Sequence, residues 1–307
     1  MLEATLDALA DQTFGDFEVI VVDDGSSDGS GDAARAAGAR LDVTVIAGGG
    51  RGAVAARTCG VEAARGEIVA FTDSDCIPQP GWLAAGVREI DRGADVVQGL
   101  TRPDGGVRPH ERTLWSEHDD GLFATCNVFY RRDAFDRAGG FDGGAGDRLG
   151  FRPGEALTGL GFGEDTLLGW RVRRHGTSSH APDAIVLHHV FPTDLADTAR
   201  RAWAAGGFPG LVVEVPELRH LLLTGGFILG PWSRLGLYAG VAAMVARRPT
   251  IGVAFLLVWA GGRWRRLAPL SGSLRRKVAA LPADLAIDAV TATALVAGSI
   301  RRRRLVL

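Results

Sequence analysis

Cysteine is scarce in this sequence, and the few cysteines form no disulfide or metal-binding pattern. The 307 residues contain Cys59, Cys76 and Cys126, an odd number with no C-x-x-C spacing. The sequence therefore predicts neither a disulfide framework nor a zinc site, and it favours a reducing compartment. The first residues also lack the basic start and long apolar core of a secretory signal peptide, so we do not expect one.

Acidic residues are almost missing from the last third of the chain. From Leu218 to Leu307 there are 13 arginines and Lys277 against Asp284 and Asp288, a balance of +12. The residues before Leu218 carry 20 arginines against 34 acids, a balance of −14, so the net charge of −2 conceals the asymmetry. A basic, apolar tail suits anionic lipid headgroups, and we expect the two regions to face different surroundings.

No apolar run in this tail reaches the roughly 20 residues that a membrane-spanning helix needs. Its apolar segments are separated by arginines in every gap, whereas spanning helices alternate basic and non-basic loops. The segments are 221–230, 235–246, 250–262 and 285–300. We expect in-plane or re-entrant helices on one membrane face, with a short spanning hairpin or a buried helical subdomain as alternatives.

The first two-thirds of the chain alternate short apolar strands with amphipathic helices. Strands are expected at 17–22, 42–47, 67–72, 94–101, 123–132 and 184–189, and helices at 31–39, 53–64, 82–90 and 164–174. This alternation indicates a parallel sheet covered on both faces, with ligands bound beyond the carboxyl ends of its strands. A glycine-rich connection at 139–163 is too long for an ordinary turn, and such loops are commonly functional lids or disordered.

Two aspartates one residue apart, Asp73 and Asp75, follow one of these strands in the stretch "FTDSDC". In an extended segment they share a face, and two carboxylates suit Mg²⁺ or Mn²⁺, which in turn can hold a diphosphate. Turns are also rich in aspartate, so the pair alone is weak evidence. The upstream stretch "VVDDGSSDGS" is equally open, because its acids either meet a ligand or only shape a turn and cap a helix.

Four ordered stretches together resemble the family-2 glycosyltransferases of the GT-A fold, over roughly residues 2 to 190. They are "QTFGDFEVIVVDDGSSDGS", "GRGAVAARTCGVEAARGEIVAFTDSDC", "NVFYRRDAFDRAGGFD" and "GFGEDTLLGWRVRRHG". The resemblance implies an α/β, Rossmann-like and mostly parallel sheet, here without the further first strand with which members normally begin. It also implies a catalytic domain at 1–205, and we expect a membrane-associated helical region at 206–307.

The resemblance implies a role for each matching residue on the donor side. Donor contacts would come from Asp23, Asp24, Arg57, Asp73 and Asp75, with Asp24 at the base and Arg57 near the ribose or phosphates. Asp75 would be the direct metal ligand, with Asp73 and His188 beside it and His189 as the second choice. An imidazole ligand would tilt the metal preference from Mg²⁺ towards Mn²⁺. An ordinary strand terminus is the structural alternative for both histidines.

On the acceptor side the resemblance implies that Asp165 is the catalytic base, with Glu164 beside it and with Asn127 and Trp170 facing the acceptor. Sugar transfer needs the charge of the leaving diphosphate neutralised and a base for the acceptor hydroxyl. Asp165 lies in the first turn of a helix, whose dipole favours the anion, so we expect it to be ionised at neutral pH. Compensation of that dipole is its simpler structural role.

A dinucleotide-binding turn, Gly50-x-Gly52-x-x-Ala55, offers the main competing interpretation, an NAD-dependent oxidoreductase. It leaves the preceding strand–helix unit unused, and no second nucleotide-binding half follows. The prediction is a metal-dependent, inverting glycosyltransferase at the cytoplasmic face of the cell membrane. Its partners would be a nucleotide-diphosphate sugar and a lipid-linked or envelope glycan, and not nucleic acid. An inactive membrane-bound scaffold is a further alternative.

Overall fold

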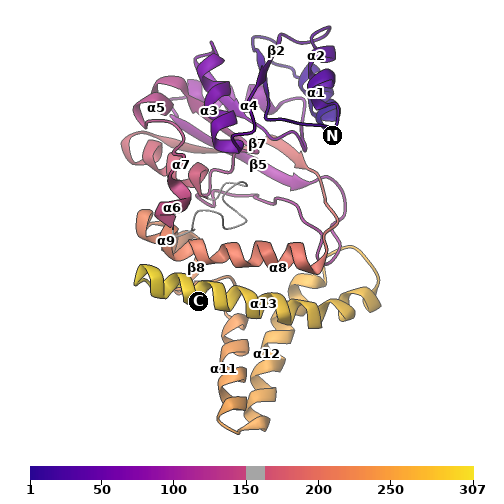
Figure 1. Cartoon of the computed structure of the whole chain (residues 1–307), viewed down its shortest axis with the longest axis vertical. Coiled ribbons are helices and arrows are strands. Elements are labelled where there is room, and N and C mark those ends of the chain that lie inside the picture. Colours follow the sequence, from indigo (N-terminus) through magenta and orange to yellow (C-terminus); the bar gives the residue numbers. More distant parts are fainter. Residues whose placement is uncertain (150–162) are drawn as a thin grey trace. The chain divides into compact units, whose positions relative to one another are not determined.

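The computed structural model describes residues 1–149 and 163–307, which form two compact units. The first comprises Met1–Asp104 and Thr113–Val190, and the second comprises Gly105–Arg112 and Phe191–Leu307 (Figure 1). The predicted boundary near residue 205 stays a prediction; in the structure helix α8 (Leu195–Trp203) already belongs to the second unit. The middle of the glycine-rich connection lies outside the described residues.

The first unit follows the predicted alternation of strands and helices. Its elements are α1 (Leu2–Ala10), β1 (Val19–Asp23), α2 (Ser30–Ala37), β2 (Val43–Ala47), α3 (Ala53–Ala63), β3 (Ile68–Phe71), β4 (Cys76–Pro78), α4 (Trp82–Asp91), β5 (Val96–Pro103), β6 (Val128–Arg131), α5 (Arg132–Arg137), α6 (Ala145–Leu149), α7 (Glu164–His175) and β7 (Ser178–His188). Charged residues at both ends of α7 suit its dipole, because Glu164 and Asp165 lie in its first turn and Arg173 and Arg174 lie in its last turn.

The strand directions correct the expectation of a mostly parallel sheet. In the described residues β1 pairs in parallel with β2, and a separate five-stranded sheet has the order β3-β6-β5-β7-β4. In that sheet only β5 and β7 are parallel, and the other three ladders are antiparallel. The prediction inferred parallel strands from the alternation with helices, although it placed no helix between the strands at 94–101 and 123–132. Between β5 and β6 the described chain has no helix, so β6 can return beside β5 in the opposite direction.

A cavity of about 870 Å³ with both apolar and charged lining residues lies between β1 and β3 and is also lined by α1 and α3. Among the described residues, each of these strands has a partner on one side only. Hydrogen bonds from Val19 N–H to Asp42 O and from Gly48 N–H to Asp23 O direct alternate residues of β1 towards β2. Ile20 and Val22 therefore direct their backbone groups to the opposite edge. The expectation that the sheet lacks its first strand stays a prediction.

The core of the first unit lies between the five-stranded sheet and helix α4. Trp82 at the start of α4 is 2% exposed, and its ring centre lies 5.0 Å from that of Phe129 on β6. The helix can approach this closely because Gly86 has no side chain; a Cβ there would lie 2.3 Å from the Phe129 ring. Burial of each large aromatic side chain contributes about 2–3 kcal/mol, so this contact holds the platform on which the candidate site is built.

The second unit is mainly helical. Its elements are α8, a 3₁₀ turn (Ala204–Gly207), α9 (Phe208–Glu214), α10 (Leu218–Leu221), the short strands β8 (Leu223–Thr224) and β9 (Ile228–Leu229), α11 (Ser233–Val245), α12 (Pro249–Leu267) and α13 (Leu274–Arg302). The apolar segments at 235–246, 250–262 and 285–300 lie in α11, α12 and α13, whereas 221–230 forms the β8–β9 hairpin. By length and composition, α13 alone among the described helices could cross a membrane.

Candidate active site

The two aspartates of the "TDSDC" stretch lie in the turn between β3 and β4, at the edge of the five-stranded sheet. Strand β4 pairs antiparallel with β7, and this register sets Cys76 directly opposite His188. As a result, His188 Nε2 lies 3.7 Å from Asp75 Oδ2. The structure thus brings together two predicted metal ligands, Asp75 and His188, that are far apart in the sequence.

The hydrogen bonds of His188 determine which of its ring nitrogens can bind a cation. Nδ1 lies 2.8 Å from the carbonyl oxygen of His189, which can only accept, so we assign the proton to Nδ1. Nε2 is the ring nitrogen on the side of Asp75. The His189 N–H donates to the Asp75 carbonyl oxygen at 2.9 Å and fixes this corner of the backbone. An imidazole nitrogen and a carboxylate oxygen form a donor set that fits a divalent cation such as Mn²⁺.

Cys76 is near the same point, since ligand atoms of Asp75, Cys76 and His188 all lie within 4.8 Å of one another. A hydrogen bond with Cys126, together with burial, holds the pKa of the Cys76 thiol far above its usual range. A protonated, fully buried thiol is a poor metal ligand and behaves as a small apolar side chain. Cys76 is accordingly part of the core, and the exposed side chain of His189 is not among the clustered ligand atoms.

Arg57 on α3 connects the two acidic clusters of the site. Its Nη1 lies 3.1 Å from Glu164 Oε1, and its Nη2 lies 3.7 Å from Asp73 Oδ1. Glu164 is 4% exposed, so the cation compensates a carboxylate that has little contact with water. Partial withdrawal from water raises the pKa of Asp73, and Arg57 opposes that rise. The Arg57–Glu164 pair was not predicted. Burial of a carboxylate is costly unless a positive group or hydrogen-bond donors lie beside it, so a partner for Glu164 follows once its burial is known.

Asp165 differs from its predicted state. Its Oδ1 accepts the N–H of Thr166 at 2.7 Å, but burial and the neighbouring Glu164 carboxylate raise the pKa of Asp165 to about 7. The prediction of an ionised Asp165 at neutral pH is thus met only in part, because a half-buried carboxyl group with a pKa of about 7 still holds its proton in part of the molecules. Removal from water disfavours the anion more than the helix terminus favours it. A carboxyl group with a pKa near neutrality is suited to accept and release a proton at working pH.

Asp23 and Asp24 lie where β1 ends and hold the loops around them. Asp24 accepts the backbone N–H groups of Arg51 at 3.0 Å and of Gly52 at 2.7 Å, at the start of α3. A hydrogen bond from the Ser26 N–H to Asp23 Oδ1 lowers the pKa of Asp23. The amides of the Gly50-x-Gly52 turn thus already bind a carboxylate, which disfavours a pyrophosphate there. Contact of Asp24 with a donor base stays a prediction.

Asn127 and Trp170 are not brought to this cluster. Asn127 is 1% exposed, accepts from Trp82 Nε1 at 2.8 Å and donates to the carbonyl oxygens of Leu100 and Ala184 at 2.9 Å. Trp170 is 6% exposed and donates to the Gly121 carbonyl oxygen at 2.9 Å. Both side chains therefore stabilise the core, and their predicted contact with an acceptor stays a prediction.

An acidic pair at a sheet edge, a histidine from the neighbouring strand and an acidic helix start define a GT-A type of nucleotide-sugar transferase fold. The same fold is found in the mannosyltransferase PcManGT from Pyrobaculum calidifontis, solved in complex with GDP-Man and Mn²⁺. The TM-score is 0.56 at 21% identity, over 98% of this chain and 83% of that one.

The amino-terminal half resembles a known family. Residues 1–144 match the model of glycosyl transferase family 2. The glycosyltransferase AglE of Haloferax volcanii is 33% identical over 155 residues, which are 46% of this chain and 51% of the relative. A pre-mycofactocin glycosyltransferase of Mycobacterium tuberculosis is 26% identical over 254 residues, 74% of this chain and 49% of the relative. The chain spans about half the length of these relatives.

Proposed function

We propose that the first unit transfers a sugar from a nucleotide-diphosphate donor to a hydroxyl acceptor, with a divalent cation held by Asp75 and His188. The observation that carries the proposal is the β4–β7 register, which sets His188 Nε2 3.7 Å from Asp75 Oδ2. Asp73, 34% exposed at its side chain, lies beside them. When bound, the cation supplies positive charge against the leaving diphosphate. A neighbour of the same fold was solved with GDP-Man and Mn²⁺, which supports this donor class.

In this proposal Asp165 is the base. Its carboxylate takes the proton of the acceptor hydroxyl while the hydroxyl oxygen bonds to the anomeric carbon and the bond to the diphosphate breaks. A single displacement of this kind inverts the anomeric configuration. Arg57 and Glu164 keep the α7 terminus in place beside the aspartate pair. The intact contacts around Asp75, Asp165 and His188 favour an enzyme over an inactive scaffold.

We further infer that the acceptor is a lipid-linked or envelope glycan met at the cytoplasmic face of a membrane. The support is the composition of the second unit: 13 arginines and one lysine against two acids from Leu218 onward. A basic region of this kind is attracted to anionic lipid headgroups. An acceptor carried on a lipid would be concentrated at the same surface.

The test is calorimetric titration with UDP, GDP and dTDP, each without metal, with Mn²⁺ and with Mg²⁺. We expect one nucleotide to bind only with metal, and Asp75→Asn to weaken that binding at least tenfold because a ligand oxygen loses its charge. Asp183→Asn is the matched control, since Asp183 lies on the same strand as His188 with a side chain 73% exposed. Nucleotide affinity that is unchanged both by the metal and by Asp75→Asn would overturn the proposal.

A further inference from the structure

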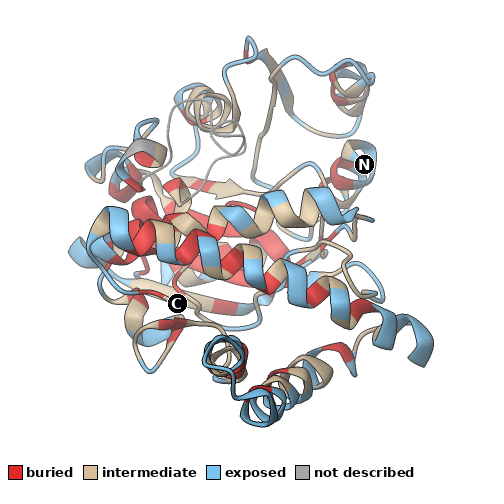
Figure 2. Cartoon of the chain, turned by 60° about the horizontal axis from the view of Figure 1, so that its bottom comes forward, coloured by how far each residue is buried: buried red, intermediate tan, exposed pale blue. Residues whose placement is uncertain are grey.

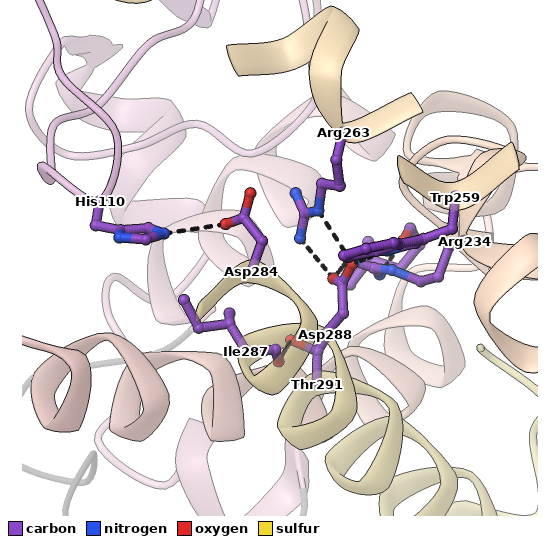
Figure 3. A network of polar contacts seen from close by, with 9 residues as sticks. His110, Arg234, Trp259, Arg263, Asp284, Ile287, Asp288 and Thr291 are labelled. Carbon is purple, nitrogen blue, oxygen red and sulfur yellow. Dashed lines mark hydrogen bonds and ion pairs between the residues drawn. The ribbon is translucent and has the colours of Figure 1, made fainter. Parts of the chain in front are cut away.

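The long helix α13 carries two acids that lie inside the second unit. Asp288 is 2% exposed and accepts from Trp259 Nε1 at 2.8 Å, from Arg263 Nη2 at 2.6 Å and from Arg234 Nη2 at 3.2 Å (Figure 3). These donors come from α11 and α12, so the carboxylate joins three helices. One turn earlier, Asp284 Oδ1 lies 3.1 Å from His110 Nε2.

The rest of α13 is also packed against its own unit. Buried residues recur along its length, as Figure 2 shows, and the helix packs against α8, the 3₁₀ turn and α9. At Gly298 a Cβ would lie 2.2 Å from the Gly206 carbonyl oxygen, so the helix and the turn are in backbone contact. The helix is thus packed along one side against its own unit, and 33% of its apolar stretch is buried. Its length and apolar composition do not make it a membrane span.

The hairpin of α11 and α12 is built differently. Its two helices touch through glycines: a Cβ at Gly236 would lie 2.7 Å from the Phe255 carbonyl oxygen, and one at Gly252 would lie 2.9 Å from Met244 Cγ. Close helix contact through small residues is the packing used within lipid, where no hydrophobic force drives two helices together. Leu256 and Met244 pack onto these glycines, and the pair does not need its other large apolar side chains at this interface.

Those apolar side chains lie instead on the outside of the hairpin. Val245 is 79% exposed, Leu257 67%, Val258 57% and Val241 53%. No charged residue occurs in 235–246 or in 251–262. On α12 the exposed positions surround the helix except for the stripe that faces α11. A helix pair that is apolar all round has no side suited to water.

We propose that the α11–α12 hairpin inserts into one leaflet of an anionic lipid bilayer, while α13 stays outside the membrane. The 12 apolar residues of each helix span about 18 Å, too short for a hydrocarbon layer of about 30 Å. Because Arg247 and Arg248 at its turn stay among the headgroups, the hairpin enters at a slant and not with its turn leading. No Asp or Glu occurs from Leu218 to Ala283, so nothing repels that anionic surface. The inference deepens the membrane location in the proposed function and is independent of the transfer chemistry.

Vesicle flotation of the full chain, without nucleotide or metal, tests the hairpin. We expect binding to vesicles of mixed phosphatidylcholine and phosphatidylglycerol, and at least tenfold weaker binding for the double variant Val245→Asp, Leu257→Asp. Ile300→Asp is the matched control, because Ile300 on α13 is an aliphatic side chain 74% exposed. Loss of binding in Ile300→Asp but not in the double variant would overturn the proposal in favour of α13. Failure of the calorimetric test would leave this result unaffected.

Two further measurements keep the test independent of folding defects. A fluorescent label on Val245→Cys, with the half-buried Cys59 replaced by Ser, should be quenched by doxyl-lipids, whereas the same label on Ile300→Cys should not. Arg247→Gln with Arg248→Gln should reduce the preference for phosphatidylglycerol roughly fivefold per charge. A soluble dimer that buries the Val245 label and shows no vesicle binding would mean that a second copy covers the hairpin, and would sink the proposal.

Discussion

At the scale of single residues, the site depends on one carboxyl group held near neutrality. Because burial raises the pKa of Asp165 to about 7, its basic form is a minority below that pH. We expect kcat/KM to rise about tenfold per pH unit up to roughly pH 7 and then to level off. Asp165→Asn should lower kcat by roughly 10²–10⁴ and abolish the pH dependence. A profile unchanged in Asp165→Asn would place the base elsewhere.

The raised pKa of Asp165 also makes the free energy of unfolding depend on pH. The folded protein holds a proton on Asp165 that the unfolded chain releases above about pH 4, so this group lowers the free energy of unfolding as pH rises from about 4 to 7. Removing the charge in Asp165→Asn removes this loss. From about pH 4 to 7, both kcat/KM and the free energy of unfolding should therefore change with pH differently in the unchanged protein and in Asp165→Asn.

Arg57 gives a second prediction at this scale. Replacement by alanine leaves Glu164, 4% exposed, without its cation, and we expect a loss of about 2–4 kcal/mol in the free energy of unfolding. Arg65→Ala is the control, because Arg65 is 72% exposed in its own ion pairs and should cost less than about 1 kcal/mol. Urea denaturation measures both. Equal losses would show that the Arg57–Glu164 pair is no stronger than a surface pair.

At the scale of elements, the sequence was sufficient where a residue's role is local. The strands and helices of the first unit follow from apolar periodicity, and Asp73 and Asp75 were located by their position after a strand. Strand β4 was not predicted, because three residues ending in Pro78 carry no periodicity. Yet β4 is the element that aligns Cys76 with His188 and so completes the ligand pair.

What could not be predicted depends on contacts between elements. Arg57 was expected near the ribose or phosphates, and only the folded structure shows that it pairs with Glu164. The raised pKa of Asp165 has the same origin, since local sequence reports the helix terminus but not the depth of burial. Asn127 resembled a site residue in its motif, while its three hydrogen bonds are in the core.

At the scale of the whole molecule, the charge asymmetry of the sequence separates into two units. The acidic part holds the candidate site, and the basic part holds Asp284 and Asp288 as internal counter-charges. The composition predicted this division, but it assigned no different roles to the apolar segments of the tail. The buried acids on α13 and the exposed apolar side chains on the outside of the α11–α12 hairpin distinguish these segments from one another.

The cavity between β1 and β3 has a consequence for the timing of amide exchange. The N–H groups of Val19 and Val21 are directed to β2, whereas those of Ile20 and Val22 are directed to the cavity. Amide exchange rates along β1, measured by residue-resolved NMR, should therefore alternate. Exchange should be fast at Ile20 and Val22 and slow at Val19 and Val21. An extended segment seated in the cavity would pair with the open edge, and all four amides would then exchange slowly. Uniformly slow exchange in the chain alone would mean that this edge of β1 is closed in solution.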